Sequence, residues 1–154
     1  MAAGGRKFLE KANRIGLVTT LVIYSLYILM FLFRLLGMSD LGYSVAAFQF
    51  VFALPLIYLL LKARQLDRPA LYTVQVCLML FFLLVEFFLD YYFQIEFRQI
   101  RWAAILYITL FCASTGGLLG LTVYAENRTW RVLAIILFFV MVALAFVQRA
   151  ITGM

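Results

Sequence analysis

Histidine is absent from this 154-residue chain. Its absence excludes haem ligation by histidine, histidine-based zinc or iron sites, and a Ser-His-Asp triad. Cysteine occurs only twice, as Cys77 and Cys112, and each lies in a separate apolar run without a Cys-x-x-Cys spacing. Their predicted depths differ by about 9 Å along the membrane normal, so we expect two unpaired thiols. No metal site and no cofactor are expected.

Charge is also scarce. Charged residues make up 13% of the chain, whereas they make up about 25% of an ordinary soluble domain. Hydrophobic residues make up 67% of the chain, against roughly 45–50% of such a domain. A globule of this size would have to expose much of that apolar surface to water. The composition therefore excludes a soluble enzyme, a disordered tail, a nucleic-acid module and a disulfide scaffold, and it makes the lipid bilayer the expected surroundings.

Five apolar runs cover most of the chain, and each has 19–24 residues. A helix crosses the bilayer with about 20 such residues. We therefore predict an all-α fold, a polytopic transmembrane helical bundle in which residues 1–154 form a single integral membrane domain. The five expected spans are residues 15–36, 43–61, 70–93, 102–124 and 130–148.

The orientation follows from lysine and arginine, which are enriched in cytoplasmic loops. With a cytoplasmic N-terminus, nine basic residues lie inside and four outside. We therefore expect a multi-pass protein of the plasma or inner membrane, with its C-terminus on the opposite side. The nine are Arg6, Lys7, Lys11, Arg14, Lys62, Arg64, Arg68, Arg128 and Arg131, and the four are Arg34, Arg98, Arg101 and Arg149.

A few polar side chains fall inside the expected spans, where an ionisable group costs about 2.5–3.5 kcal/mol. Glu86 and Asp90 are four residues apart and share one face of the third span. At a rise of 1.5 Å per residue, Arg34 reaches the depth of Asp90, and Glu86 lies about 6 Å deeper. Gln49 of the second span falls in the same layer. The sequence thus predicts a polar cluster of Arg34, Gln49, Glu86 and Asp90 in the outer half of the bilayer.

Two interpretations of this cluster stay open. It is either a structural ion pair that locks the first and third spans, or a binding or proton-transfer site that opens to the outside. Glu86 is the deepest member and the best functional candidate. Tyr24, Tyr27, Phe31 and Arg34 follow one stripe of the first span. They either pack against other helices or form a groove facing Glu86 for a small cationic or amphiphilic ligand.

Small residues gather near the middle of the fourth span. Gly116 and Gly120 form a Gly-x-x-x-Gly pair, which lets another helix approach closely. Ser114 and Thr115 can hydrogen-bond back to their own helix. Close packing is the expected role, within the chain or with a protein partner or second copy through this helix. The alternative is a local break of the helix, as in transporters with interrupted spans.

Three functional hypotheses follow. The first is a non-enzymatic membrane subunit or assembly partner, since loops are short and catalytic residue types are missing. The second is a small carrier or channel for a proton, cation or amphiphile, with Glu86 at its centre and Arg34 and Asp90 tuning it. An intramembrane lipid-modifying enzyme ranks last, because no nucleophile–base pair or metal cluster is visible. The chain is expected not to be an enzyme and not to bind nucleic acid.

Overall fold

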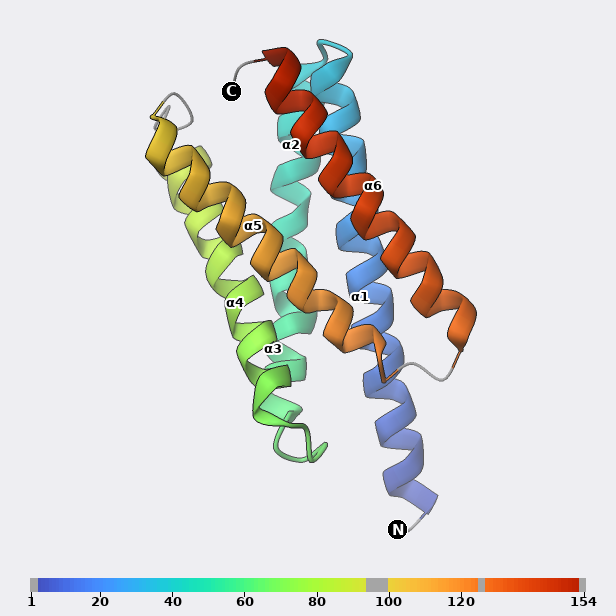
Figure 1. The fold of residues 1–154 in the computed structure, drawn as a ribbon. Helices are drawn as coiled ribbons and strands as arrows, with labels where there is room; N and C mark the ends of the chain where they lie inside the picture. Colours follow the sequence, from blue (N-terminus) through green and yellow to red (C-terminus); the bar gives the residue numbers. More distant parts are fainter. Residues whose placement is uncertain (1–2, 94–99, 125–126, 153–154) are drawn as a thin grey trace.

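The computed structural model describes residues 3–93, 100–124 and 127–152, and all regular structure in these ranges is helical (Figure 1). The prediction of an all-α bundle with five helices able to cross a membrane is confirmed. Because five is odd, the two termini lie at opposite ends of the bundle (Figure 1), here called its N-terminal and C-terminal ends. The spans are Lys7–Leu35, Ser39–Lys62, Ala70–Tyr92, Arg101–Thr122 and Arg128–Ile151.

The first helix, α1 (Ala3–Leu35), starts twelve residues before the apolar run that predicted it. Its additional turns bury Ala12, which belongs to the same hydrophobic cluster as Ala63 and Leu66. The ammonium group of Lys62 lies 6.0 Å from the ring centre of Phe8. The apolar run marks the part of α1 that is expected in lipid, whereas the helix itself begins well before that run.

The second span is built from three helical segments. Helix α2 (Ser39–Gln49) passes into a 3₁₀ turn, η1 (Phe50–Phe52), which leads to α3 (Ala53–Lys62). Pro55 explains the interruption, because proline has no N–H to donate to the carbonyl group of Val51 four residues earlier. The tighter 3₁₀ turn ends three residues before this proline, which lies in the first turn of α3, and the span stays continuous.

The third span changes its winding just after Glu86. Helix α4 (Ala70–Glu86) continues as a π-helix, η2 (Phe87–Tyr92). Helices α5 (Arg101–Thr122) and α6 (Arg128–Thr152) are each uninterrupted. Because α5 runs unbroken through Gly116 and Gly120, the alternative of a local break in the fourth span is wrong.

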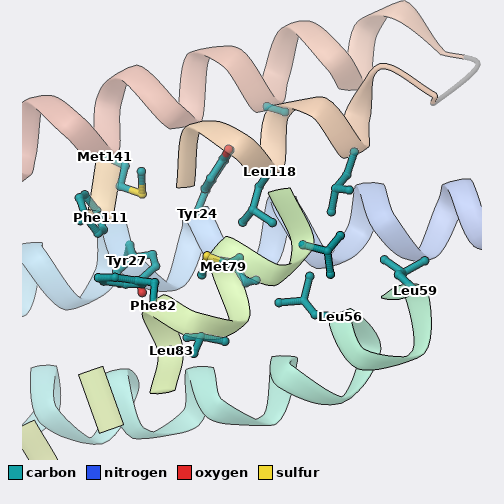
Figure 2. Packing of buried hydrophobic residues seen from close by; sticks show 14 of the residues in the cluster. Tyr24, Tyr27, Leu56, Leu59, Met79, Phe82, Leu83, Phe111, Leu118 and Met141 are labelled. Carbon is teal, nitrogen blue, oxygen red and sulfur yellow. The ribbon is translucent and has the colours of Figure 1, made fainter. Parts of the chain in front are cut away.

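Helix α1 occupies the centre of the bundle and contacts α2, α3, α5 and α6, while α4 packs against α3 and α5. The buried side chains form one hydrophobic cluster, whose close-up in Figure 2 shows Tyr27, Phe82 and Phe111 next to one another. Figure 1 shows α5 and α6 close to each other near the connection between them and diverging towards the C-terminal end of the bundle.

The turn between α1 and α2 requires a glycine. Gly37 has φ +76°, in the left-handed region. Its N–H donates to the carbonyl oxygen of Arg34 at 3.2 Å, and the N–H of Met38 donates to that of Phe33 at 2.8 Å. These two bonds form a Schellman motif that ends α1. The motif places Arg34 in the last turn of α1, beside the start of α2.

Candidate functional site

A cavity of about 400 Å³ lies towards the C-terminal end of the bundle. Its walls come from the second half of α1, the start of α2, the end of α4, the first half of α5 and the last third of α6. It therefore lies where α5 and α6 diverge (Figure 1). Most of the wall is aliphatic or aromatic, and its charged residues are Arg34, Asp40, Glu86 and Arg149.

Glu86 is the buried carboxylate of this cavity, with only 2% of its surface exposed. The hydroxyl group of Tyr27 donates a hydrogen bond to one of its carboxylate oxygens at 3.0 Å. The hydroxyl group of Tyr107 donates to the other oxygen at 3.4 Å. Glu86 thus joins α4 to α1 and to α5, and the two tyrosines offset part of the cost of placing a carboxylate among apolar helices.

Aromatic packing holds these two tyrosines in place. The ring of Tyr27 meets that of Phe111 edge to face, with centres 5.2 Å apart. The ring of Phe82 lies 5.5 Å from that of Tyr107 and also packs against Tyr27. Figure 2 shows Tyr27 and Phe82 side by side beneath Phe111. Such contacts restrict the rings, so the hydroxyl groups stay directed at Glu86.

Arg34 lines the same cavity as Glu86, and Asp90 follows Glu86 by four residues, in the π-helix η2. The Cγ of Arg34 would be 3.1 Å from a methyl group placed on Gly42 of α2. The close approach of α2 directs this side chain along the cavity wall.

Gln49 does not line the cavity with the other predicted residues. Its side chain is fully buried, and neither amide atom has a hydrogen-bond partner among the described residues. Depth arithmetic places Gln49 at the level of the cluster, but it says nothing about the direction in which the side chain leaves the helix. The structure therefore brings Glu86 and Arg34 to one cavity, whereas Asp90 and Gln49 are not among its lining residues.

The glycines of α5 serve contacts within the chain. A methyl group on Gly120 would overlap the amide group of Gln75 in α4, and one on Gly117 would lie 3.4 Å from the Cβ of Gln75. Gly116 faces the ring of Phe138 in α6 at 3.5 Å. Gly116 and Gly120 thus pack against different helices of the same chain, so this face is already covered.

The hydroxyl side chains of α5 are satisfied locally. Ser114 and Thr115 both donate to the carbonyl oxygen of Phe111, at 3.0 and 2.6 Å. The hydroxyl group of Tyr24 donates to the carbonyl oxygen of Thr115 at 2.6 Å. Of the aromatic stripe on α1, Tyr24 therefore packs between helices, whereas Tyr27 and Phe31 line the cavity together with Arg34.

Sequence reasoning missed Tyr107, Asp40 and Arg149 as residues of this site. For Tyr107 a signal existed. It lies six residues after the start of α5, and Glu86 lies six residues before the end of the third span. Both are therefore about 9 Å from the same end of the bundle. Matching polar residues by depth across all spans, rather than across the first three alone, would have paired them.

Both cysteines are free, as expected. Cys112 is half-buried and lines the cavity, whereas Cys77 is exposed on the outside of the bundle. In the described ranges, the side chains of Cys, Asp and Glu do not gather in groups of three that could hold a metal ion.

Comparison with protein families, with curated proteins and with solved structures gave no match.

Proposed function

We propose that this chain is a non-enzymatic membrane carrier that binds a small amphiphile in the cavity beside Glu86. The observation that carries the proposal is the cavity itself, which has a volume of about 400 Å³ and one deeply buried carboxylate. Ligand sites are typically of about 300–1,000 Å³, mostly apolar, with a few converging polar groups.

The lining favours an amphiphile over a simple ion. Phe31, Phe111 and Phe146 supply apolar wall, and Phe146 is itself more than half exposed on the outside of α6. Because Phe146 both lines the cavity and is exposed on the outside of α6, an apolar chain that lies along this side chain would reach lipid. A bare proton or metal cation would need none of this apolar surface.

The orientation belongs to the same proposal. The excess of basic residues in the loops at the N-terminal end of the bundle favours a cytoplasmic position for that end. The cavity then lies in the half of the bilayer away from the cytoplasm, in a plasma or inner membrane. An amphiphile would enter from that leaflet.

The test compares two alanines of α6 that differ in their surroundings. Ala145 lines the cavity, whereas Ala143 is exposed and does not line it. Phenylalanine at position 145 fills part of the cavity, and phenylalanine at position 143 adds the same volume outside. Each protein is reconstituted in vesicles containing a single-chain phospholipid, re-extracted, and weighed by native mass spectrometry.

We expect wild type and Ala143→Phe to retain the single-chain phospholipid in a defined ratio, and Ala145→Phe to lose at least nine-tenths of it. Equal retention by all three proteins, or no retention by wild type, would overturn the proposal. Thermal unfolding of each variant checks that the added ring has not unfolded the bundle.

A second proposal is that the chain acts as a subunit or assembly partner, with α6 as its docking face. In the most apolar window of α6 only 11% of residues are buried, against 44% for α1. Because the glycines of α5 are covered, α6 is the helix with the most surface left for a partner helix. Blue-native electrophoresis in a mild detergent tests this proposal. The wild type should migrate as a species heavier than one chain, and that species should disappear when tryptophans replace exposed residues of α6.

A further inference from the structure

The charged residues of the cavity are of both signs and balance one another. Arg34 and Arg149 contribute two positive charges, and Asp40 and Glu86 contribute two negative charges. Because the charges of the lining residues that the structure describes cancel, the cavity favours neither a net anion nor a net cation. It favours a ligand that carries both charges itself.

The buried carboxylate of Glu86 is separated along the cavity from the other three charged side chains. Arg34 and Arg149 lie in the last turns of α1 and α6, close to the C-terminal end of the bundle. Glu86 is bonded to Tyr27, which lies seven residues before Arg34, or about 10 Å deeper along α1. The basic groups thus stand near the mouth of the cavity and the buried carboxylate stands at depth.

Each end has its own chemistry. Guanidinium groups match the oxygens of a phosphate, to which they can donate two parallel hydrogen bonds. At the deep end, a carboxylate lies beside the rings of Tyr27, Tyr107 and Phe111, and both a carboxylate and aromatic rings attract an ammonium group. Asp40 is exposed at the mouth and is not part of the deep end.

We infer that the cavity recognises a phosphate-linked ammonium group, as in phosphoethanolamine or phosphocholine. The phosphate lies at Arg34 and Arg149, and the ammonium group lies at Glu86. This inference rests on the proposed function and names its ligand class. The same chemistry occurs in a lipid headgroup and in a free water-soluble phosphate ester, so the experiment has an arm for each.

The experiment uses the reconstituted full chain and three single-chain probes of equal chain length. The first is lysophosphatidylethanolamine, which has both charges. The second is lysophosphatidylglycerol, which has the phosphate alone, and the third is an alkyltrimethylammonium salt, which has the ammonium group alone. Native mass spectrometry measures their retention from an equimolar mixture, with and without free phosphoethanolamine.

Wild type is expected to retain the zwitterionic probe at least ten-fold better than either of the others. Glu86→Gln should bind lysophosphatidylglycerol as well as the zwitterion, and Arg149→Gln should lose its preference over the alkylammonium salt. Arg64→Gln, which removes an exposed arginine of the connection before α4, is the control and should keep the wild-type preference.

The outcomes separate the two proposals. If all three probes are retained alike, the inference about the headgroup fails while the amphiphile carrier stands. If no probe is retained, the proposed function fails as well. Displacement by free phosphoethanolamine at low concentration identifies a water-soluble ester as the ligand, and its failure to compete identifies the lipid headgroup. Should Glu86→Gln not fold, Arg149→Gln alone decides the inference.

Discussion

The hydroxyl group of Tyr27 lies 3.0 Å from a carboxylate oxygen of Glu86, and this bond joins the central helix of the bundle to the third span. Both side chains are buried, at 1% and 2% exposure. In lipid, neither group has water as an alternative partner, so each depends on the other more than it would in a soluble protein.

Replacement of Tyr27 by phenylalanine tests this bond, because it removes the hydroxyl group and keeps the ring among Phe82 and Phe111. We expect a loss of about 1 kcal/mol in the free energy of unfolding. Equilibrium unfolding in mixed micelles gives the value. Tyr107→Phe, whose hydroxyl group is 3.4 Å from Glu86, should lose less, and the prediction is wrong if it loses more.

The contact of Gly120 with Gln75 predicts a compensating pair of substitutions. Gly120→Ala forces the amide group of Gln75 out of its place between α4 and α5, at a cost of about 1 kcal/mol. Gln75→Ala removes that amide, so the double variant should be about as stable as Gln75→Ala alone. Gly116→Ala should change the stability little, because the added methyl group meets Phe138 at an ordinary contact distance. If the losses from Gly120→Ala and Gln75→Ala add up in the double variant, this account is wrong.

Arg68 holds the N-terminal end of the bundle together through its guanidinium group. Its central carbon lies 3.9 Å from the ring centre of Tyr124 and 5.4 Å from that of Tyr72, and the same group donates a hydrogen bond to Asn13. Arg68→Lys keeps the charge but loses the planar stack, so we expect a loss of about 1–2 kcal/mol by the same unfolding assay. Arg64→Lys at an exposed position serves as control and should be neutral.

The charge asymmetry of the loops predicts which ends face the cytoplasm. A fluorescent reporter that matures only in the cytoplasm should be bright when it is fused to the N-terminus and dark when it is fused to the C-terminus. An alkaline phosphatase reporter, active only outside the cytoplasm, should give the opposite pattern. Two bright fluorescent fusions would contradict the odd number of spans as well as the orientation.

The five spans and their approximate bounds could be predicted because lipid imposes a minimum length on every apolar helix. The extension of α1 back to Ala3 could not, since residues 3–14 include five charged residues and so fall outside any apolar run. The π-helical winding after Glu86 also escapes a periodicity argument, because the run that leads into it is almost entirely apolar and gives no sign of a change in helical period.

For the site, depth was predictable and direction was not. Residue counting placed Glu86 and Arg34 near the same end of the bundle, and both line the cavity. The same counting admitted Gln49, whose side chain does not line the cavity, and overlooked Tyr107, which does. The rotation of each helix about its axis is set by packing against its neighbours, and a single sequence of nearly uniform hydrophobicity carries little record of it.

The placement of the two cysteines supplies a native chemical reporter. Cys112 lines the cavity and Cys77 is exposed on the outside, so Cys77→Ala leaves a single thiol in the cavity wall. A small fluorine-bearing tag attached at Cys112 would give one resonance for the empty cavity and another for the filled one. In the Cys112→Ala variant the same tag would be attached at Cys77 and would report only on the lipid outside. Ligand exchange could therefore be followed in an intact membrane without introducing a new cysteine.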